Sequence, residues 1–283
     1  MKKLETLKLD FRDPYVKDLA SKIVFLDIET SLVTAKVFST GNQYIKANQL
    51  QDTTKILTVA YGTLADLHTK GRKGVTVLSN RHSKTFKKEP HNDKELLEAL
   101  WPVLDNAEVI VAHNASFDEG WLLGRYVELG MKLPSKFFTF CTYQNLRPFR
   151  MTSKKLDELS KNLIGTSKLP TDFALWERCS RGEIEAFKEM EAYNVGDVYD
   201  TLYKLWLRTA YYNANKAIDF ANPESSLVQC KVDGQYLVDY GEYLNRSNGL
   251  RYLQYKNPRS GQVYVDRYNT KSKKAGIGLI RPR

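Results

Sequence analysis

The sequence has little cysteine and no long apolar run. Its 283 residues include three cysteines, Cys141, Cys179 and Cys230, which are too few and too scattered for a disulfide framework. No segment approaches the ~18 consecutive apolar residues of a membrane span. The lysines at positions 2 and 3 are followed by no apolar signal core. We therefore expect a cytoplasmic protein without membrane association.

Histidine and acidic residues are also scarce. Of the four histidines, His82 and His91 lack the regular spacing of metal ligands, so we expect no zinc site from them. Acidic residues number 33 against 43 basic ones, and the net charge of +10 favours a polyanionic partner. A hydrophobic content of 42% indicates a folded chain, long enough for one sizeable core and a small appendage.

The most informative stretch is the segment 23–32, IVFLDIETSL. Its first four residues form an apolar run typical of a central strand covered on both faces. Asp27 and Glu29 then interrupt the run. Residues two apart on a strand point to the same side, so these carboxylates converge on one spot. A divalent cation such as Mg²⁺ or Mn²⁺ would relieve their repulsion; the alternative is a strand end that emerges into water.

Two later stretches carry further polar side chains. Residues 109–120, VIVAHNASFDEG, read as an apolar strand that breaks into a polar turn, with Asp118 opening a helix that continues to Leu129. We expect Phe117 to pack in the core behind this turn. Residues 192–206 are helical by pattern, with a bend expected near Gly196, and place Tyr193 four residues before Asp197.

Asp-x-Glu on a strand, then Asn-x-x-Phe-Asp, then Tyr-x-x-x-Asp, in that order, resembles the DEDD superfamily of 3′→5′ exonucleases, tyrosine-containing branch. The resemblance covers roughly residues 22–208. Members include proofreading domains of DNA polymerases and similar stand-alone nucleases of bacteriophages. It implies an α/β protein with a ribonuclease H-like mixed sheet flanked by helices, located in the host cytoplasm if a bacteriophage encodes it.

The resemblance also implies a mechanism and a set of site residues. Two ions, Mg²⁺ or Mn²⁺, would lie ~4 Å apart, one acidifying the attacking water and the other stabilising the departing 3′-oxygen. Motif matching assigns them the metal ligands Asp27, Glu29, Asp118 and Asp197. Tyr193 would orient the water, since an ordinary tyrosine pKa near 10 makes it a poor base at neutral pH. The residues expected to contact substrate are Thr30, Leu32, Asn114 and His113. For His113, a local hydrogen-bonding role is an equal alternative.

The organisation expected along the chain is a lead-in at 1–21 packed on the sheet edge, an exonuclease domain at 22–212 and a β-rich appendage at 223–283. Within the domain, residues 36–52 form a polar loop long enough to be functional. Residues 71–74 read as a hairpin turn, and residues 166–179 as irregular, with Trp176 anchored to the core.

The appendage is basic and rich in tyrosine. Residues 230–283 hold eleven Lys and Arg against four Asp and Glu, a balance of +7, together with seven of the 17 tyrosines. Cations beside flat rings suit single-stranded nucleic acid; the alternative is that the tyrosines pack their own sheet. Cys230-x-x-Asp233-Gly234 and Asn257-x-x-Ser260-Gly261 resemble two zinc-ribbon knuckles with three of four ligands replaced, so we expect no zinc.

The resemblance thus implies a metal-dependent exonuclease that releases nucleoside 5′-monophosphates, and we expect single-stranded DNA as its substrate, with RNA as an open alternative. A non-catalytic nucleic-acid-binding module is the rival interpretation, although all four carboxylates are present. A proofreading subunit that works with a separate polymerase or replication protein differs in its partners and shares the chemistry.

Overall fold

The structure, a computed structural model, describes residues 7–42, 44–212, 218–276 and 280–282. The chain divides into two compact units. The larger is Ser21–Leu205, and the smaller combines Met1–Ala20 with Trp206–Arg283. The described part of the N-terminal lead-in is thus grouped with the C-terminal region in the smaller unit.

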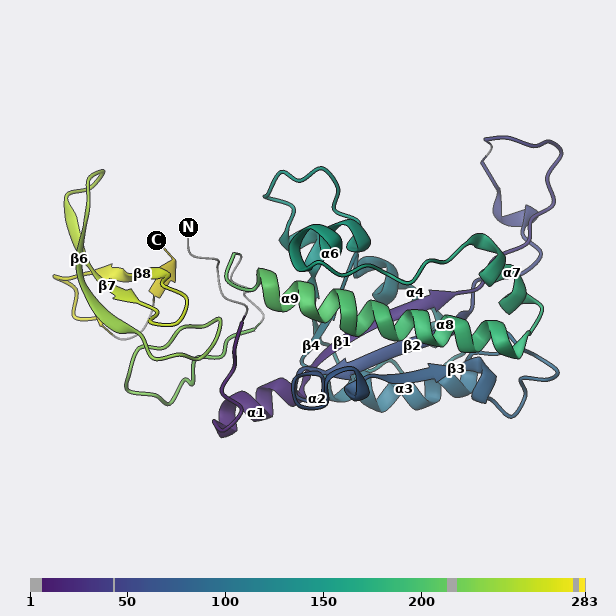
Figure 1. Ribbon diagram of the computed structural model, residues 1–283, viewed down its shortest axis with the longest axis horizontal. Coiled ribbons are helices and arrows are strands. Elements are labelled where there is room, and N and C mark those ends of the chain that lie inside the picture. Colours follow the sequence, from purple (N-terminus) through teal and green to yellow (C-terminus); the bar gives the residue numbers. More distant parts are fainter. Residues whose placement is uncertain (1–6, 43, 213–217, 277–279, 283) are drawn as a thin grey trace. The chain divides into compact units, whose positions relative to one another are not determined.

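The larger unit is built on a mixed five-stranded sheet in the order β3-β2-β1-β4-β5 (Figure 1). The central strand β1 pairs antiparallel with β2 on one side and parallel with β4 on the other. This confirms the predicted α/β architecture with a mixed sheet. The strands are β1 (Ile23–Thr30), β2 (Ile56–Thr63), β3 (Thr76–Ser79), β4 (Val109–Ala112) and β5 (Phe138–Cys141).

Helices cover both faces of this sheet. On one face, Val24, Leu26 and Ile28 of β1 share a core with leucines of α3 and α4. On the other, the ring of Phe25 meets that of Tyr203 edge-on, with centroids 5.4 Å apart. Helix α8 runs across this second face and contacts β1 and β2 (Figure 1). The helices of the larger unit are α2 (Leu64–Lys70), α3 (Lys94–Asn106), α4 (Ser116–Glu128), α5 (Thr142–Asn145), α6 (Leu156–Ile164), α7 (Phe173–Ser180) and α8 (Ile184–Gly196). The chain passes from the larger to the smaller unit within α9 (Lys204–Thr209).

Two local expectations were wrong. The residues between β2 and β3 form α2 and a 3₁₀ turn, Gly71–Gly74, rather than a hairpin, because Thr63 caps the helix by accepting a hydrogen bond from the Asp66 amide. The segment expected to be irregular contains α7, which Asp172 caps and which buries Leu175. Trp176 packs against the same core, as predicted.

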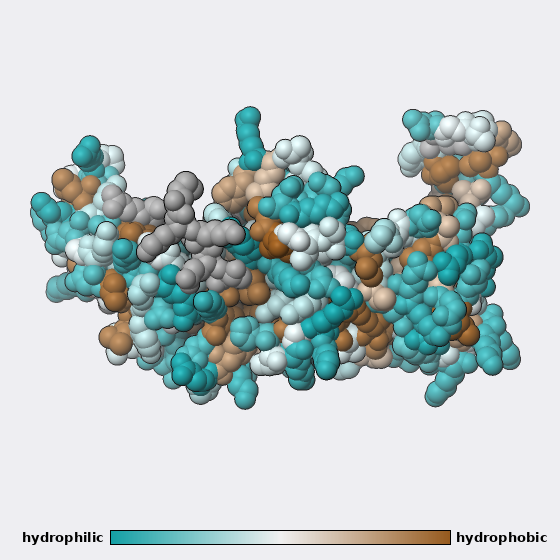
Figure 2. Space-filling model, viewed as in Figure 1, coloured by the Kyte–Doolittle hydropathy of each residue, from teal (hydrophilic) through white to brown (hydrophobic). Residues whose placement is uncertain are grey.

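The loop at 36–52 projects from the unit and carries exposed apolar side chains. A bridge between Ala35 and Leu50 closes its base. Val37 is 44% exposed and Phe38 is fully exposed. Figure 2 shows hydrophobic, brown surface on the projecting loop. The loop is therefore more apolar at its surface than its polar sequence suggests.

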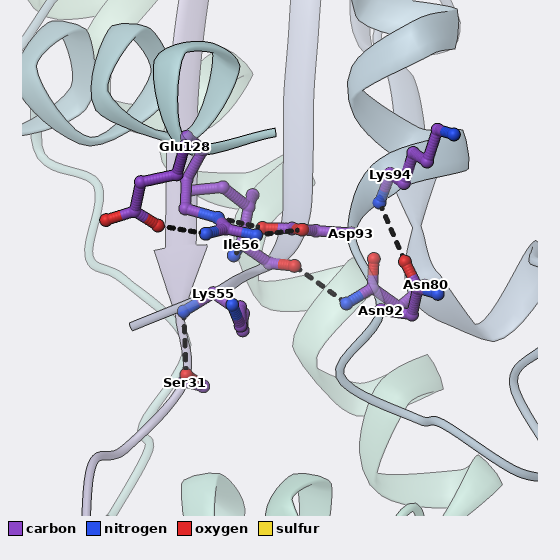
Figure 3. Close-up of polar contacts among 9 residues, drawn as sticks. Ser31, Lys55, Ile56, Asn80, Asn92, Asp93, Lys94 and Glu128 are labelled. Carbon is purple, nitrogen blue, oxygen red and sulfur yellow. Dashed lines mark hydrogen bonds and ion pairs between the residues drawn. The ribbon is translucent and has the colours of Figure 1, made fainter. Parts of the chain in front are cut away.

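A buried ion pair joins three elements of the larger unit (Figure 3). The guanidinium of Arg125, on α4, donates from Nε and Nη2 to the two carboxylate oxygens of Asp93, each at 2.8 Å. Asp93 immediately precedes α3 and also accepts from the Ile56 amide, at the start of β2, at 3.0 Å. Both side chains are nearly inaccessible, at 3% for Arg125 and 1% for Asp93. The pair thus fixes α3 and α4 against the sheet.

The smaller unit contains an antiparallel sheet in the order β6-β7-β8-β9. Helix α1 (Pro14–Ser21) belongs to the same unit, and Tyr15 donates a hydrogen bond to the Asp219 carbonyl at 3.1 Å. A small core includes Cys230, Tyr264 and Ile280. The strands are β6 (Val238–Asn245), β7 (Leu250–Lys256), β8 (Val263–Asn269) and β9 (Ile280–Pro282).

The two knuckle-like segments of this unit form equivalent turns. The Gly234 amide donates to the Cys230 carbonyl and the Gly261 amide to the Asn257 carbonyl, each at 2.8 Å. Both glycines have positive φ, at 67° and 74°. The turns meet through the Asn257 side chain, which donates to the two carboxylate oxygens of Asp233 at 3.2 and 3.0 Å. Hydrogen bonds between buried side chains thus join the two turns.

Removing one partner of the buried ion pair should strongly destabilise the larger unit. We expect Arg125→Ala to lower the free energy of unfolding by about 3–5 kcal/mol, because Asp93 is left buried without its cation. Glu128→Ala is the matched control, since Glu128 also binds Arg125 but is 51% exposed; it should cost less than about 1 kcal/mol. Urea unfolding measures both. Similar losses in the two variants would contradict the role given to the buried pair.

Candidate metal centre

Two carboxylates project from β1 toward α8. Asp27 and Glu29 lie on the same face of the strand as Phe25, opposite the α3 and α4 side. Asn194 of α8 donates from Nδ2 to Asp27 Oδ2 at 2.6 Å, and its Oδ1 accepts from the Thr58 hydroxyl at 3.2 Å. The sequence analysis missed Asn194. Its place directly after Tyr193 in the third motif is the signal that could have revealed it.

The third motif supplies Asp197 from the far end of α8. The backbone changes there to a π-helical segment, Asp197–Tyr203, in place of the expected bend at Gly196. Such segments recur at functional sites, where they shift side chains relative to a regular helix. Tyr193 and Asp197 are both buried, at 8% and 1% exposure. The ring of Trp176 meets that of Tyr193 edge-on at 6.3 Å.

The structure brings three of the four predicted metal ligands together. Carboxylate oxygens of Asp27, Glu29 and Asp197 all lie within 4.8 Å of one another. Asp118, at the start of α4, is not in this group; its Oδ1 accepts a hydrogen bond from the Ile28 amide at 3.2 Å. It is nevertheless close enough that its charge raises the pKa of Asp27.

These residues fit a divalent cation. Clustered carboxylate oxygens are the hard ligands that Mg²⁺ and Mn²⁺ prefer. Asp197 Oδ1 is buried and has no hydrogen-bond partner among the described residues. A buried carboxylate oxygen without a partner is unfavourable unless a cation satisfies it.

The electrostatics of the site reflect burial and crowding. Burial, together with the charge of Asp197, raises the pKa of Glu29 to about 8. Burial also raises the pKa of Asp118 to about 7. The pKa values of Asp27 and Asp197 are raised as well, chiefly by burial. Without a cation, the folded protein therefore holds protons on these groups more tightly than the unfolded chain does.

Lys168 is a further member of the site that the sequence analysis missed. Its ammonium binds Asp197 Oδ2 and donates to the Tyr193 hydroxyl at 3.2 Å. Lys168 lies in the segment between α6 and α7, outside all three motifs. No local pattern marks it, since the tertiary fold alone brings this segment to Asp197.

The predicted substrate contacts lie at different places around the acidic cluster. Thr30 ends β1, and Leu32 lines a cleft of about 860 Å³ together with Lys55 and Phe173. Asn114 is exposed, and its φ of 62° is a left-handed conformation that asparagine tolerates. It lines a second cleft of about 560 Å³, which Lys168 also lines.

The structure supports the local hydrogen-bonding role expected of His113, but it does not support the burial expected of Phe117. Both ring nitrogens of His113 engage protein atoms, the Thr142 hydroxyl at 2.8 Å and the Lys154 carbonyl at 2.9 Å. Burial lowers its pKa to about 4. These contacts support the local hydrogen-bonding role. The expectation of a buried Phe117 was wrong: it is 44% exposed and its ring lies 6.4 Å from that of Trp121.

Fold and site together define an α/β protein with an acidic cluster at the end of its central strand, compatible with a ribonuclease H-like fold. Neither known protein-family models nor curated protein sequences match the chain. None of the helices in the described part of the chain has the length and apolar content to traverse a bilayer.

The raised pKa values predict how pH affects the metal-free protein. Because Glu29 and Asp118 have folded-state values near 8 and 7, well above their ordinary values near 4, their protonation stabilises the fold at low pH. This contribution is lost as pH rises through 7 and 8. The melting temperature in EDTA should therefore fall between pH 6.5 and 8.5, and saturating Mg²⁺ should restore it.

Glu29→Gln provides the comparison, because it removes one of the titrating groups. Its melting temperature in EDTA should fall less over the same interval, as followed by circular dichroism. An equally steep fall in the variant would contradict the assignment of this pH dependence to the acidic cluster.

Proposed function

We propose that the protein is a metal-dependent 3′→5′ exonuclease of the tyrosine-containing DEDD type. The observation that carries the proposal is the convergence of Asp27, Glu29 and Asp197, from elements far apart in the sequence, within 4.8 Å. Tyr193 lies one helical turn before Asp197, and Asp118 lies in the first turn of α4, the helix that follows the neighbouring strand β4. The 3′→5′ polarity rests on the motif resemblance.

The four carboxylates would hold Mg²⁺ or Mn²⁺. When bound, two such ions would acidify the attacking water and stabilise the departing 3′-oxygen. Asn194 fixes the Asp27 carboxylate through its 2.6 Å hydrogen bond, so that this ligand is oriented before a cation arrives. The Arg125–Asp93 pair holds α4, which carries Asp118, in a similar way.

Tyr193 positions the reacting water through its phenol. Burial and the charge of Asp197 raise its pKa to about 12. The hydroxyl therefore keeps its proton at neutral pH, and it can orient a water molecule but not act as a base. This strengthens the positioning role inferred from an ordinary tyrosine.

The substrate class follows from charge and from the motifs. A net charge of +10 favours a polyanion, and the reaction class implies nucleoside 5′-monophosphates as products. We propose single-stranded DNA as the substrate, with RNA as the alternative, and a separate polymerase or replication protein as a partner in the cell.

The smaller unit would add affinity for the single strand. Tyr240 is 50% exposed, and the Lys256 ammonium lies 5.1 Å from its ring centre. Lys274 lies 5.7 Å from the ring of Tyr268. In contrast, Tyr264 is buried in the core of this unit. Some tyrosines thus pack the sheet, while others are available beside cations, an arrangement suited to bases and phosphates.

The first test removes two metal ligands. Asp27→Ala with Glu29→Ala should abolish cleavage of end-labelled single-stranded DNA in Mg²⁺ or Mn²⁺ while binding of the strand persists, because the acids hold the cations and lie outside the core. Asp200→Asn is the matched control: Asp200 is also on the π-helical segment but forms ion pairs with Arg72 and Lys204. The control should retain most of its activity.

Product ladders and the released nucleotide distinguish the outcomes on DNA, RNA and duplex substrates. Turnover by the double variant above a tenth of the wild-type rate would rule out the proposed metal site. Binding without cleavage by the wild-type protein would instead favour a non-catalytic nucleic-acid-binding module.

A second test concerns the smaller unit. Lys271, Lys273 and Lys274 are exposed, and replacing all three with glutamine should weaken binding of long single strands. The slope of log affinity against log salt should become shallower by about 2, since roughly 0.7 counterions are released per phosphate contact. Lys84, Lys87 and Lys88, also exposed, replaced in the same way form the charge-matched control in the larger unit. Equal slopes in the two triple variants would contradict a specific role for the smaller unit.

A further inference from the structure

Lys168 reaches the acidic centre from a segment that two hydrogen bonds anchor, one at Thr166 and one at Lys168 itself. Its backbone amide donates to Asp157 Oδ1 of α6 at 2.9 Å. Two residues earlier, the Thr166 hydroxyl donates to the Asp200 carbonyl of the π-helical segment at 2.8 Å. The backbone of Lys168 is therefore held beside Asp197, and the position of the ammonium depends on its four-carbon side chain.

The Lys168 ammonium supplies a positive charge next to the carboxylates. It binds Asp197 Oδ2 and the Tyr193 hydroxyl, and lies 5.2 Å from the centre of the Tyr193 ring. Its charge also lowers the pKa values of Asp27, Glu29 and Asp118, against the effect of burial. One side chain thus offsets part of the repulsion among all four carboxylates.

One ammonium cannot satisfy every oxygen of this centre. Four carboxyl groups share a single positive charge, and Asp197 Oδ1 still has no hydrogen-bond partner among the described residues. A divalent cation that binds Asp27, Glu29 and Asp197 would need the same carboxylate that Lys168 holds. The divalent cation and the Lys168 ammonium would also repel each other if both were bound to the Asp197 carboxylate.

We propose that Lys168 is an internal counter-ion that competes with the divalent cation for Asp197. In the metal-free protein its ammonium stabilises the acidic centre, and cation binding displaces it from Asp197 Oδ2. The flexible stem allows this movement without a shift of the anchored backbone, and Lys168 already lines the 560 Å³ cleft that would receive the ammonium. The inference rests on the proposed function, because it assigns a regulator to the same metal site.

The first experiment measures Mn²⁺ binding by titration calorimetry without nucleic acid. Lys168→Met keeps an apolar stem and removes the charge, so it should bind Mn²⁺ about tenfold more tightly than wild type. Its metal-free form should melt at a lower temperature than the wild type. Lys188→Met is the matched control, because Lys188 is on α8 and pairs with the exposed Glu185; it should change neither quantity.

The second experiment uses the wild-type protein and so does not depend on the folding of a variant. Reductive methylation followed by peptide mass spectrometry should modify Lys168 faster with saturating Mg²⁺ than in EDTA, because the displaced ammonium is released from Asp197. Methylation of Lys188 should be unaffected.

The results of the two experiments distinguish the counter-ion role of Lys168 from the proposed metal site. Equal or weaker Mn²⁺ affinity in Lys168→Met, or equal methylation of Lys168 in Mg²⁺ and EDTA, would overturn the counter-ion role and leave the proposed nuclease intact. Absence of Mn²⁺ binding by the wild type and both variants would overturn the metal site, and with it both proposals. Cleavage assays on the same preparations separate these cases.

Discussion

Repulsion among four carboxylates is the constraint on which the arrangement of the larger unit depends. They come from β1, α4 and the end of α8, and burial would force protons onto them at neutral pH unless positive charge is supplied. The protein supplies one positive charge itself, through Lys168, and leaves a buried oxygen of Asp197 unsatisfied. The fold thus holds a centre that is unfavourable alone, and the proposed cation would stabilise it.

The scaffold around this centre is built to keep it in place. β1 is paired on both sides, so its carboxylates cannot move apart by a shift of the strand. Asn194 fixes Asp27 from α8, while the buried Arg125–Asp93 pair fixes α4. The hydrogen bond of Asn194 and the Arg125–Asp93 pair hold these elements before any ligand binds. Such preorganisation keeps the side chains of a site in place.

In the smaller unit, hydrogen bonds join buried polar side chains of two turns. Its two knuckle-like turns meet through Asn257 and Asp233, and Tyr211 donates to the same Asp233 carboxylate at 2.6 Å. Asp233 and Asn257 are almost completely buried, at 2% and 0% exposure. Hydrogen bonds satisfy these polar groups and hold the turns together. Gly234 and Gly261, which end the two knuckle-like patterns, have the left-handed conformation that the turns require.

The sequence by itself determined the mixed α/β architecture, the acidic strand and the carboxylates of the three motifs. These features are local, because alternation along a strand and spacing along a helix fix which side chains share a face. It also indicated Trp176 as a core residue. It failed at α7, which the adjacent Asp172 caps, and at Phe117, which lies on an exposed part of α4 beside Trp121.

Only the tertiary structure decided the rest of the site. Lys168 reaches Asp197 across 29 positions of the chain and Asn194 reaches Asp27 across 167. Such contacts leave no periodic signal, since they depend on how the elements pack. The same holds for the lead-in, which joins the smaller unit from the opposite end of the chain. Local patterns therefore specified the proposed metal ligands, while packing specified the groups that contact them.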